Sequence, residues 1–169
     1  MLEVGKAGTA GVANGVLPFV RDGAVVATVR SSQWKEAATA VVGDRQWVFA
    51  KSRGTLVARW AVDPEGTSRL SARQSSFWRR TWEVDLEGTA VEVRSVSRWR
   101  STRQYLVDGR EVARSGSTGG WTPRPTLSGA DSLPLHHQVF VLWLELVINR
   151  RDQAALAGAT TAAVIGGSS

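Results

Sequence analysis

Arginine and tryptophan side chains that could bind an anion gather in one part of the sequence. Two short runs, Trp78–Arg80 and Arg98–Arg100, combine both residue types. A guanidinium fork matches phosphate oxygens, and an indole can stack on a base or lie at a membrane interface. The candidate anion-binding residues are Arg79, Arg80, Arg94, Arg98, Arg100 and Arg103. In the simpler alternative, the tryptophans belong to the core and the arginines form a solvated face.

A predicted β-hairpin would bring these arginines together. A two-residue turn at Glu87-Gly88 places the large apolar side chains of both strands on one face. The predicted partners are Leu86 with Thr89, Val84 with Val91, and Trp82 with Val93. Arg79 and Arg80 then lie across from residues 94–98, at the open end of the hairpin. Glu83 would face Glu92, an unfavourable pair that a nearby arginine would relieve.

Catalytic residues are scarce. The chain has no cysteine and two histidines, His136 and His137, which are adjacent at the start of a predicted helix. Neighbouring helical residues point about 100° apart, so we expect the two imidazoles not to converge on a metal. The segment Ser115–Gly120 is a flexible loop by composition and contains no phosphate-binding motif. The sequence therefore predicts a non-enzymatic protein without a cofactor or a metal site.

One carboxylate interrupts the most apolar segment of the chain. Between Val139 and Ile148 nine of ten residues are apolar, and Glu145 is the exception. Burial of an unpaired carboxylate is costly. We expect Glu145 to pair with an inward-facing arginine or to reach toward a barrel opening. A ligand-facing acid is the functional alternative.

The elements that must position these residues are marked by regularly spaced turns. The turn sequences are Asp22-Gly23, Gly43-Asp44, Asp63-Pro64-Glu65-Gly66, Glu87-Gly88 and Asp108-Gly109. Asp-Gly between apolar runs is a strong hairpin signal, because a type I′ turn needs positive φ at both central residues. Five such turns imply about ten strands. A meander of that size tends to curl or close, which hides its edges.

The apolar segment predicts a helix over residues 133–156, opened by Ser132 and Pro134. A helix that is apolar on all sides must be surrounded by protein, and a ring of strands would do this. The sequence thus predicts a single domain over residues 1–157, a β-barrel threaded by its C-terminal helix, followed by a flexible tail at 158–169.

Charge and length narrow the function classes. The net charge is +6 over 169 residues, which fits one domain. A basic surface attracts anionic lipid, phosphorylated ligands or nucleic acid, although a GC-rich genome would also favour arginine. The apolar run is about half the roughly 20 residues of a membrane-spanning helix. With no apparent secretion signal, we expect a cytoplasmic protein, peripheral at a membrane if it binds lipid.

The chain resembles the tubby C-terminal-like superfamily, which includes tubby domains, phospholipid scramblases and LURP-one-related proteins. The resemblance covers roughly residues 16–156. It rests on Leu17–Gly23, Arg103–Ala113 and the helix Val139–Ile148. It implies a twelve-stranded antiparallel β-barrel around one apolar helix. The acidic residues and cysteines of scramblases are not matched here, so calcium-driven scrambling is not expected.

These observations predict a non-catalytic LURP-one/tubby-like barrel that binds anionic phospholipid head groups or another anionic ligand. The alternatives are a regulatory or scaffold module that binds protein, and a single-stranded nucleic-acid binder that uses the arginine and tryptophan face.

Overall fold

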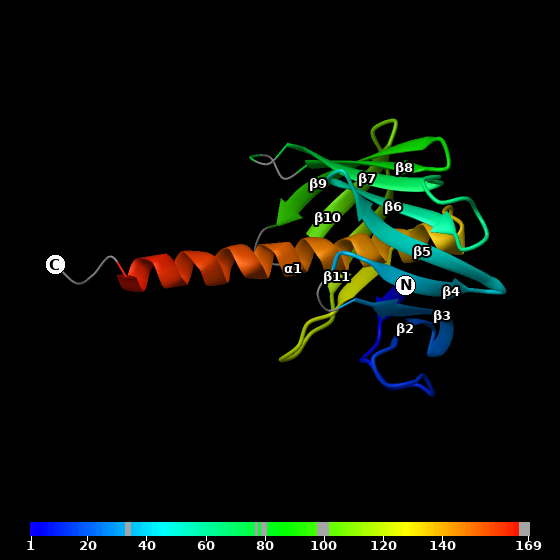
Figure 1. Ribbon diagram of the computed structural model, residues 1–169, viewed down its shortest axis with the longest axis horizontal. Helices are drawn as coiled ribbons and strands as arrows, with labels where there is room; N and C mark the ends of the chain where they lie inside the picture. The colour runs from blue at the N-terminus through cyan, green and yellow to red at the C-terminus, as the bar shows by residue number, and fades with distance from the viewer. Residues whose placement is uncertain (33–34, 77, 79–80, 98–101, 166–169) are drawn as a thin grey trace.

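The protein is an antiparallel β-barrel with one helix through its centre (Figure 1). The computed structural model describes residues 1–32, 35–76, 78, 81–97 and 102–165. Its strands are β1 (Leu2–Val4), β2 (Leu17–Arg21), β3 (Ala24–Ser31), β4 (Ala38–Val42), β5 (Arg45–Ser52), β6 (Thr55–Trp60), β7 (Leu70–Ser76), β8 (Thr81–Leu86), β9 (Thr89–Ser97), β10 (Thr102–Val107), β11 (Arg110–Ser117) and β12 (Pro125–Ser128). The helix is α1 (Leu135–Ile165).

The barrel closes because its first and last strands pair. Each strand from β2 to β12 pairs with its neighbours in the sequence, and β1 lies between β2 and β12. All of these pairings are antiparallel. Because the ring of strands is closed, the barrel has no free edge. The predicted fold class is confirmed: a mainly β, twelve-stranded antiparallel barrel that encloses one C-terminal helix.

The hairpin turns form for the backbone reason that the sequence suggests. Asp22 and Gly23 have φ of 52° and 80°, and Glu87 and Gly88 have φ of 53° and 92°. Positive φ at both central positions defines the type I′ geometry that matches strand twist. The register of β8 with β9 is confirmed, including Glu83 opposite Glu92. The expected relief comes from Arg73, which binds Glu83, and from Arg94, which binds Glu92.

The sequence interpretation missed one two-residue hairpin turn. Arg53 and Gly54, between β5 and β6, have φ of 48° and 86°. Arginine is not a typical residue for positive φ, and Arg53-Gly54 lacks the combination of an acidic residue with glycine that identified the other turns.

The first half of α1 is the core of the molecule. Residues Val139–Leu144 are each at most 1% exposed, and barrel side chains surround them. Phe49 of β5 packs against Phe140 and Trp143, with ring centroids 5.7 and 5.0 Å away. A helix apolar on every face is thus enclosed by inward-facing strand residues, as predicted.

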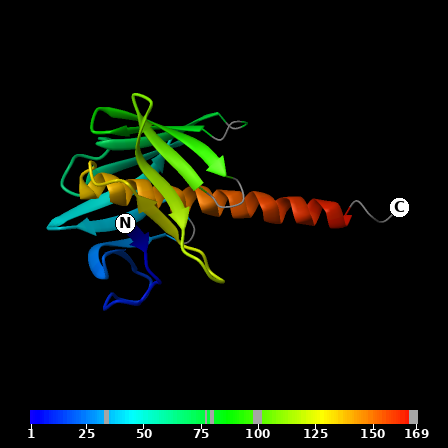
Figure 2. The ribbon, with the colours of Figure 1, turned by 180° about the vertical axis from the view of Figure 1, so that it is seen from behind.

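The second half of α1 leaves the barrel and projects beyond it (Figures 1 and 2). The helix ends at Ile165, nine residues past the predicted end at 156, so much of the predicted tail is helical. Gly158 does not stop the helix. The segment around it is rich in alanine, which has the highest helix propensity. No helix in the described part of the chain is long and apolar enough to span a bilayer.

The barrel has two distinct ends. Because consecutive strands are antiparallel, their connections alternate between the ends. At the helix-entry end lie the connections 22–23, 43–44, 61–69, 87–88, 108–109 and 129–134. Of the described residues, 5–16, 32, 35–37, 53–54, 78 and 118–124 lie in connections at the helix-exit end. Contacts of α1 with the connection 32–37 mark this exit, since Arg150 bonds Ser32 and Arg151 bonds Glu36.

Candidate functional site

The described connections at the two ends of the barrel carry opposite charge. Of the described connecting residues at the helix-entry end, one is basic, Arg69. The acidic residues there are Asp22, Asp44, Asp63, Glu65, Glu87, Asp108 and Asp131. At the helix-exit end the described connections carry one acidic residue, Glu36. The basic residues described there are Lys6, Lys35, Arg53 and Arg124.

The single carboxylate in these exit-end connections is neutralised by its neighbours. Glu36 accepts hydrogen bonds from Arg151 and forms an ion pair with Lys51, at 3.0 Å between Oε2 and Nζ. The bonds from Arg151 lower the pKa of Glu36 from 4.5 to about 2, against the opposing effect of burial. Glu36 also fixes the direction in which the helix leaves, because it ties α1 to the connection between β3 and β4.

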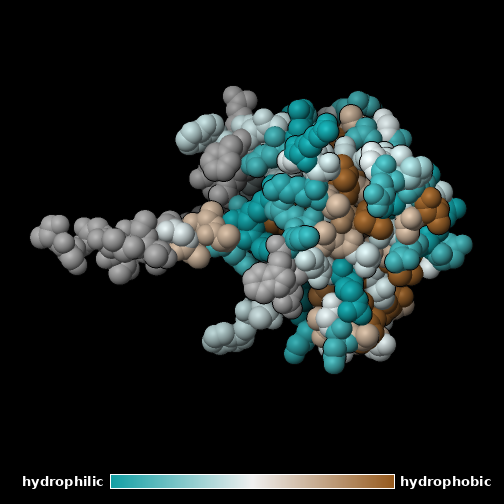
Figure 3. Space-filling view, in the orientation of Figure 1, coloured by the Kyte–Doolittle hydropathy of each residue, from teal (hydrophilic) through white to brown (hydrophobic). Residues whose placement is uncertain are grey.

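Exposed indoles accompany the positive charge. Trp78, between β7 and β8, is 88% exposed, and Trp121, between β11 and β12, is 102% exposed. Both belong to connections at the helix-exit end. Leu156, on the projecting helix, is also exposed. Figure 3 shows hydrophilic surface around the point where the helix leaves the barrel. The exit end thus combines cations, tryptophans and a projecting helix.

The structure gives a mixed account of the predicted arginine set. Arg79, Arg80, Arg98 and Arg100 lie outside the described residues. Arg94 is exposed on β9 and is bound in a bidentate pair to Glu92, at 2.7 and 2.8 Å. Arg103 differs from Arg94 because its side chain is buried inside the barrel. The anion-binding set as a whole remains a prediction, and the buried Arg103 is not part of a surface site.

Arg103 is one part of a buried polar cluster that joins β10 to α1. Its guanidinium pairs with Glu145 and reaches Asn149 at 3.5 Å and Asp152 at 3.3 Å. The hydroxyl of Tyr105 donates to the other carboxylate oxygen of Glu145 at 2.5 Å. Burial and the adjacent Glu145 charge raise the pKa of Tyr105 well above its usual value, so the phenol stays protonated.

Glu145 therefore pairs with an inward arginine, the simpler of the two predicted roles. It is 1% exposed and both of its oxygens are bonded. The sequence analysis singled out both Glu145 and Arg103, but it assigned Arg103 to the anion-binding set on the surface. The alternation of β10 gives the missing signal, because Arg103 shares a strand face with Tyr105, two residues away.

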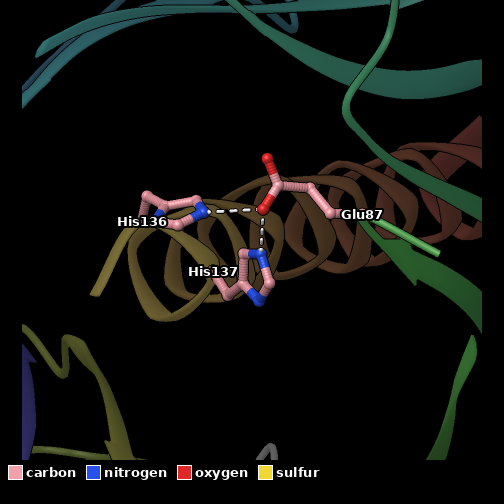
Figure 4. A group of neighbouring side chains, drawn as sticks. All are labelled: Glu87, His136 and His137. Carbon is pink, nitrogen blue, oxygen red and sulfur yellow. Dashed lines mark hydrogen bonds and ion pairs between the residues drawn. The ribbon is translucent and has the colours of Figure 1, made fainter. Parts of the chain in front are cut away.

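The expectation that the two imidazoles do not converge is wrong. His136 and His137 converge on one carboxylate oxygen of Glu87, with Nε2 to Oε2 distances of 3.1 and 3.0 Å (Figure 4). The backbone directions of adjacent helical residues do diverge, but imidazole is long enough for both Nε2 atoms to turn toward a third group. Trp47 holds His136 by stacking on it, at 5.0 Å between centroids and 14° between planes.

The sequence could not show Glu87 as the partner of the histidines. It lies 49 and 50 residues before them, in a hairpin turn. Only closure of the barrel brings the β8–β9 turn over the first turn of α1. The available signal was that this turn contains Glu rather than the Asp of two other type I′ turns, Asp22-Gly23 and Asp108-Gly109.

Comparisons with models of protein families, with curated proteins and with solved structures find no match to this chain.

Proposed function

We propose that this protein is a non-catalytic barrel that binds the anionic phospholipid surface of a membrane through its helix-exit end. The observation that carries the proposal is the segregation of charge between the ends. The described exit-end connections hold Lys6, Lys35, Arg53 and Arg124, while acidic residues predominate at the entry end. A bilayer rich in anionic lipid attracts clustered cations at about 1 kcal/mol each near the surface.

Trp78 and Trp121 support a lipid surface over a free anionic ligand. Indole side chains are enriched at the level of the head groups, where an apolar ring and a polar N–H are both satisfied. Two indoles almost fully exposed at the same end are unusual for a soluble surface. Membership of the tubby-like superfamily is part of this proposal. It is supported by the order of twelve strands and one apolar helix.

The test is co-sedimentation with vesicles of phosphatidylcholine alone and of phosphatidylcholine with about 30% phosphatidylserine. The charge variant replaces Lys6, Lys35 and Arg53 by Gln. We expect preferential binding of wild type to the anionic vesicles, and a loss of about 3 kcal/mol in the variant from three cations at about 1 kcal/mol each. Replacing Trp78 and Trp121 by Ser should weaken binding further.

The matched control removes the same charge from the rest of the barrel. Arg45, Arg73 and Arg110 are exposed outside the exit-end connections, and their replacement by Gln gives the same net charge. Equal losses in both triple variants would show that net charge alone attracts the vesicle and would remove the proposed site. Tighter binding to a single-stranded oligonucleotide than to anionic vesicles would favour the nucleic-acid alternative.

A further inference from the structure

A cluster of three potential metal ligands lies at the helix-entry end, opposite to the proposed lipid surface. It consists of Glu87 from the β8–β9 turn and His136 and His137 from the first turn of α1 (Figure 4). Their ligand atoms all lie within 4.8 Å of one another. Two imidazoles and one carboxylate from two separate elements are a known ligand set for zinc, which leaves a fourth position for water.

Two of the three spacings between ligand atoms are close to those of a tetrahedral site. At Zn–N distances of about 2.0–2.1 Å, tetrahedral ligands are about 3.3 Å apart. The two measured carboxylate-to-imidazole distances are 3.0 and 3.1 Å. Both His Nε2 atoms already point at Glu87, so an ion could enter with small side-chain rotations. The side chains of Glu87 and His136 are 34% and 27% exposed, which gives an ion access from solvent.

The cluster is held in place by surrounding contacts. The hairpin turn is fixed by the Gly88 N–H, which donates to Asp85 at 3.0 Å, and by the Glu87 N–H, which donates to the Arg69 carbonyl. His136 is clamped by stacking on Trp47. A site on rigid elements loses less entropy when it binds an ion than one on mobile loops.

One cation lies near the cluster. Arg69 is 3.9 Å from the Oε1 atom of Glu87. It is already bound to Asp63 at 2.6 and 3.0 Å and lies over the ring of Trp60. The charge of Arg69 is therefore compensated by Asp63. The Oε2 atom of Glu87, which faces the histidines, is the atom that would bind the ion.

We propose that Glu87, His136 and His137 form a binding site for one zinc-like divalent transition-metal ion. Without the ion, each Nε2 carries a proton that it donates to Glu87, since a carboxylate only accepts. Zinc takes the Nε2 lone pair of each neutral imidazole, and the proton moves to Nδ1. Imidazole ligands favour zinc, copper, nickel and iron over magnesium and calcium, which prefer oxygen.

The first test uses wild-type protein, freed of metal by a chelator, and titrates it with Zn²⁺ by calorimetry. We expect saturable binding of one ion per chain and a rise in the unfolding temperature, because the ion binds only the folded site. Mg²⁺ at the same concentration should give neither effect. Co²⁺ should give the intense visible absorption of a tetrahedral complex. Absence of saturable Zn²⁺ binding overturns the proposal.

Imidazole NMR tests the ligands without any substitution. The chain has two histidines and no cysteine, so each imidazole signal belongs to the cluster. We expect Zn²⁺ to shift the nitrogen resonances of both rings and to convert them from the Nε2–H to the Nδ1–H tautomer. Shifts in one ring only, or in neither, contradict a two-histidine site.

Two variants complete the test. Partners that merely orient a metal ligand cost about 10–100-fold in affinity when removed. Glu87→Gln, which removes a ligand charge, should therefore weaken Zn²⁺ binding by at least about 100-fold. The matched control is Glu83→Gln on β8, exposed and outside the cluster, which should bind as wild type does. Equal affinity in Glu87→Gln and wild type would overturn the proposal.

Discussion

Glu145 shows how one buried charge links the barrel wall to its helix. It lies between Arg103 and Tyr105 of β10, with almost no exposed surface. A buried ion pair does not itself guarantee stability, but removal of one partner leaves an uncompensated charge.

We therefore expect Glu145→Leu to destabilise the fold by about 3–5 kcal/mol, because it leaves the buried Arg103 guanidinium with the more distant Asp152 as its carboxylate partner. The double variant Glu145→Leu, Arg103→Met should recover much of that loss, since both charges are then gone. Urea unfolding of the two variants measures this. A double variant that is no more stable than the single one would mean that the pair also contributes through Asn149 and Asp152.

His137 predicts a dependence of stability on pH. Its pKa is lowered in the folded state by burial, so between that value and 6.5 the unfolded chain binds more protons than the folded one. The free energy of unfolding should then fall as the pH drops below about 6.5 and level off below the depressed pKa. Urea unfolding between about pH 5 and 8 tests this, because the carboxylates are ionised over that range.

The control for this pH effect is His137→Gln. In that variant the slope between pH 5 and 8 should become flatter, whatever its absolute stability. An unchanged slope would contradict the expected contribution of His137 to the pH dependence.

At the residue level, the sequence predicted the role of a side chain better than it predicted which distant residue that side chain contacts. It identified Glu145 as a buried carboxylate that pairs with an arginine, and this is confirmed. It treated His136 and His137 as a local pair and so missed Glu87, because no local rule reports contacts across a closed barrel. Pairing over long sequence distance is a property of topology.

At the level of elements, α1 carries most of the core. Leu142 is completely buried within the barrel. Leu142→Ala should cost about 2–5 kcal/mol from lost burial and the cavity left behind. Leu156→Ala, on the exposed projecting part of the same helix, is the matched control and should change the free energy of unfolding by less than about 0.5 kcal/mol.

Removal of the helix tests whether the barrel can exist without it. A fragment that ends at Gln138 would expose inward faces, such as that of Trp82 and Val84, and should aggregate. Solubility and circular dichroism of this fragment provide the measurement. A soluble fragment with cooperative unfolding would show that the strands close on their own.

Strands were easier to predict than the end of the helix. The alternating pattern and the two-residue Glu87-Gly88 turn determine the β8–β9 register pair by pair, and that register is confirmed. The end of α1 depends on a weak balance of propensities, where one Gly158 costs about 1 kcal/mol and the alanines around it compensate. A stop signal based on glycine alone therefore placed the end too early.

At the level of the whole molecule, the charge difference between the ends predicts a response to salt. The Debye length falls from about 10 Å at 0.1 M salt to about 3 Å at 1 M. Binding of the barrel to anionic vesicles should weaken strongly over that range. A part should remain, because the contribution of Trp78 and Trp121 is not electrostatic. Co-sedimentation across a salt series, with the Trp78→Ser, Trp121→Ser variant in parallel, separates the two contributions.

The pairing of β1 with β12 has a consequence for biosynthesis. The barrel closes between strands more than 120 residues apart, and the helix that fills it is translated after all twelve strands. Until the ribosome has made residues 135–148, the growing chain has hairpins but nothing to pack inside them. Contacts of such long separation form slowly, and the waiting intermediate exposes apolar faces that chaperones recognise. Folding should therefore finish only after residues 135–148 have been made, and truncated nascent chains that stop before His136 should remain sensitive to protease.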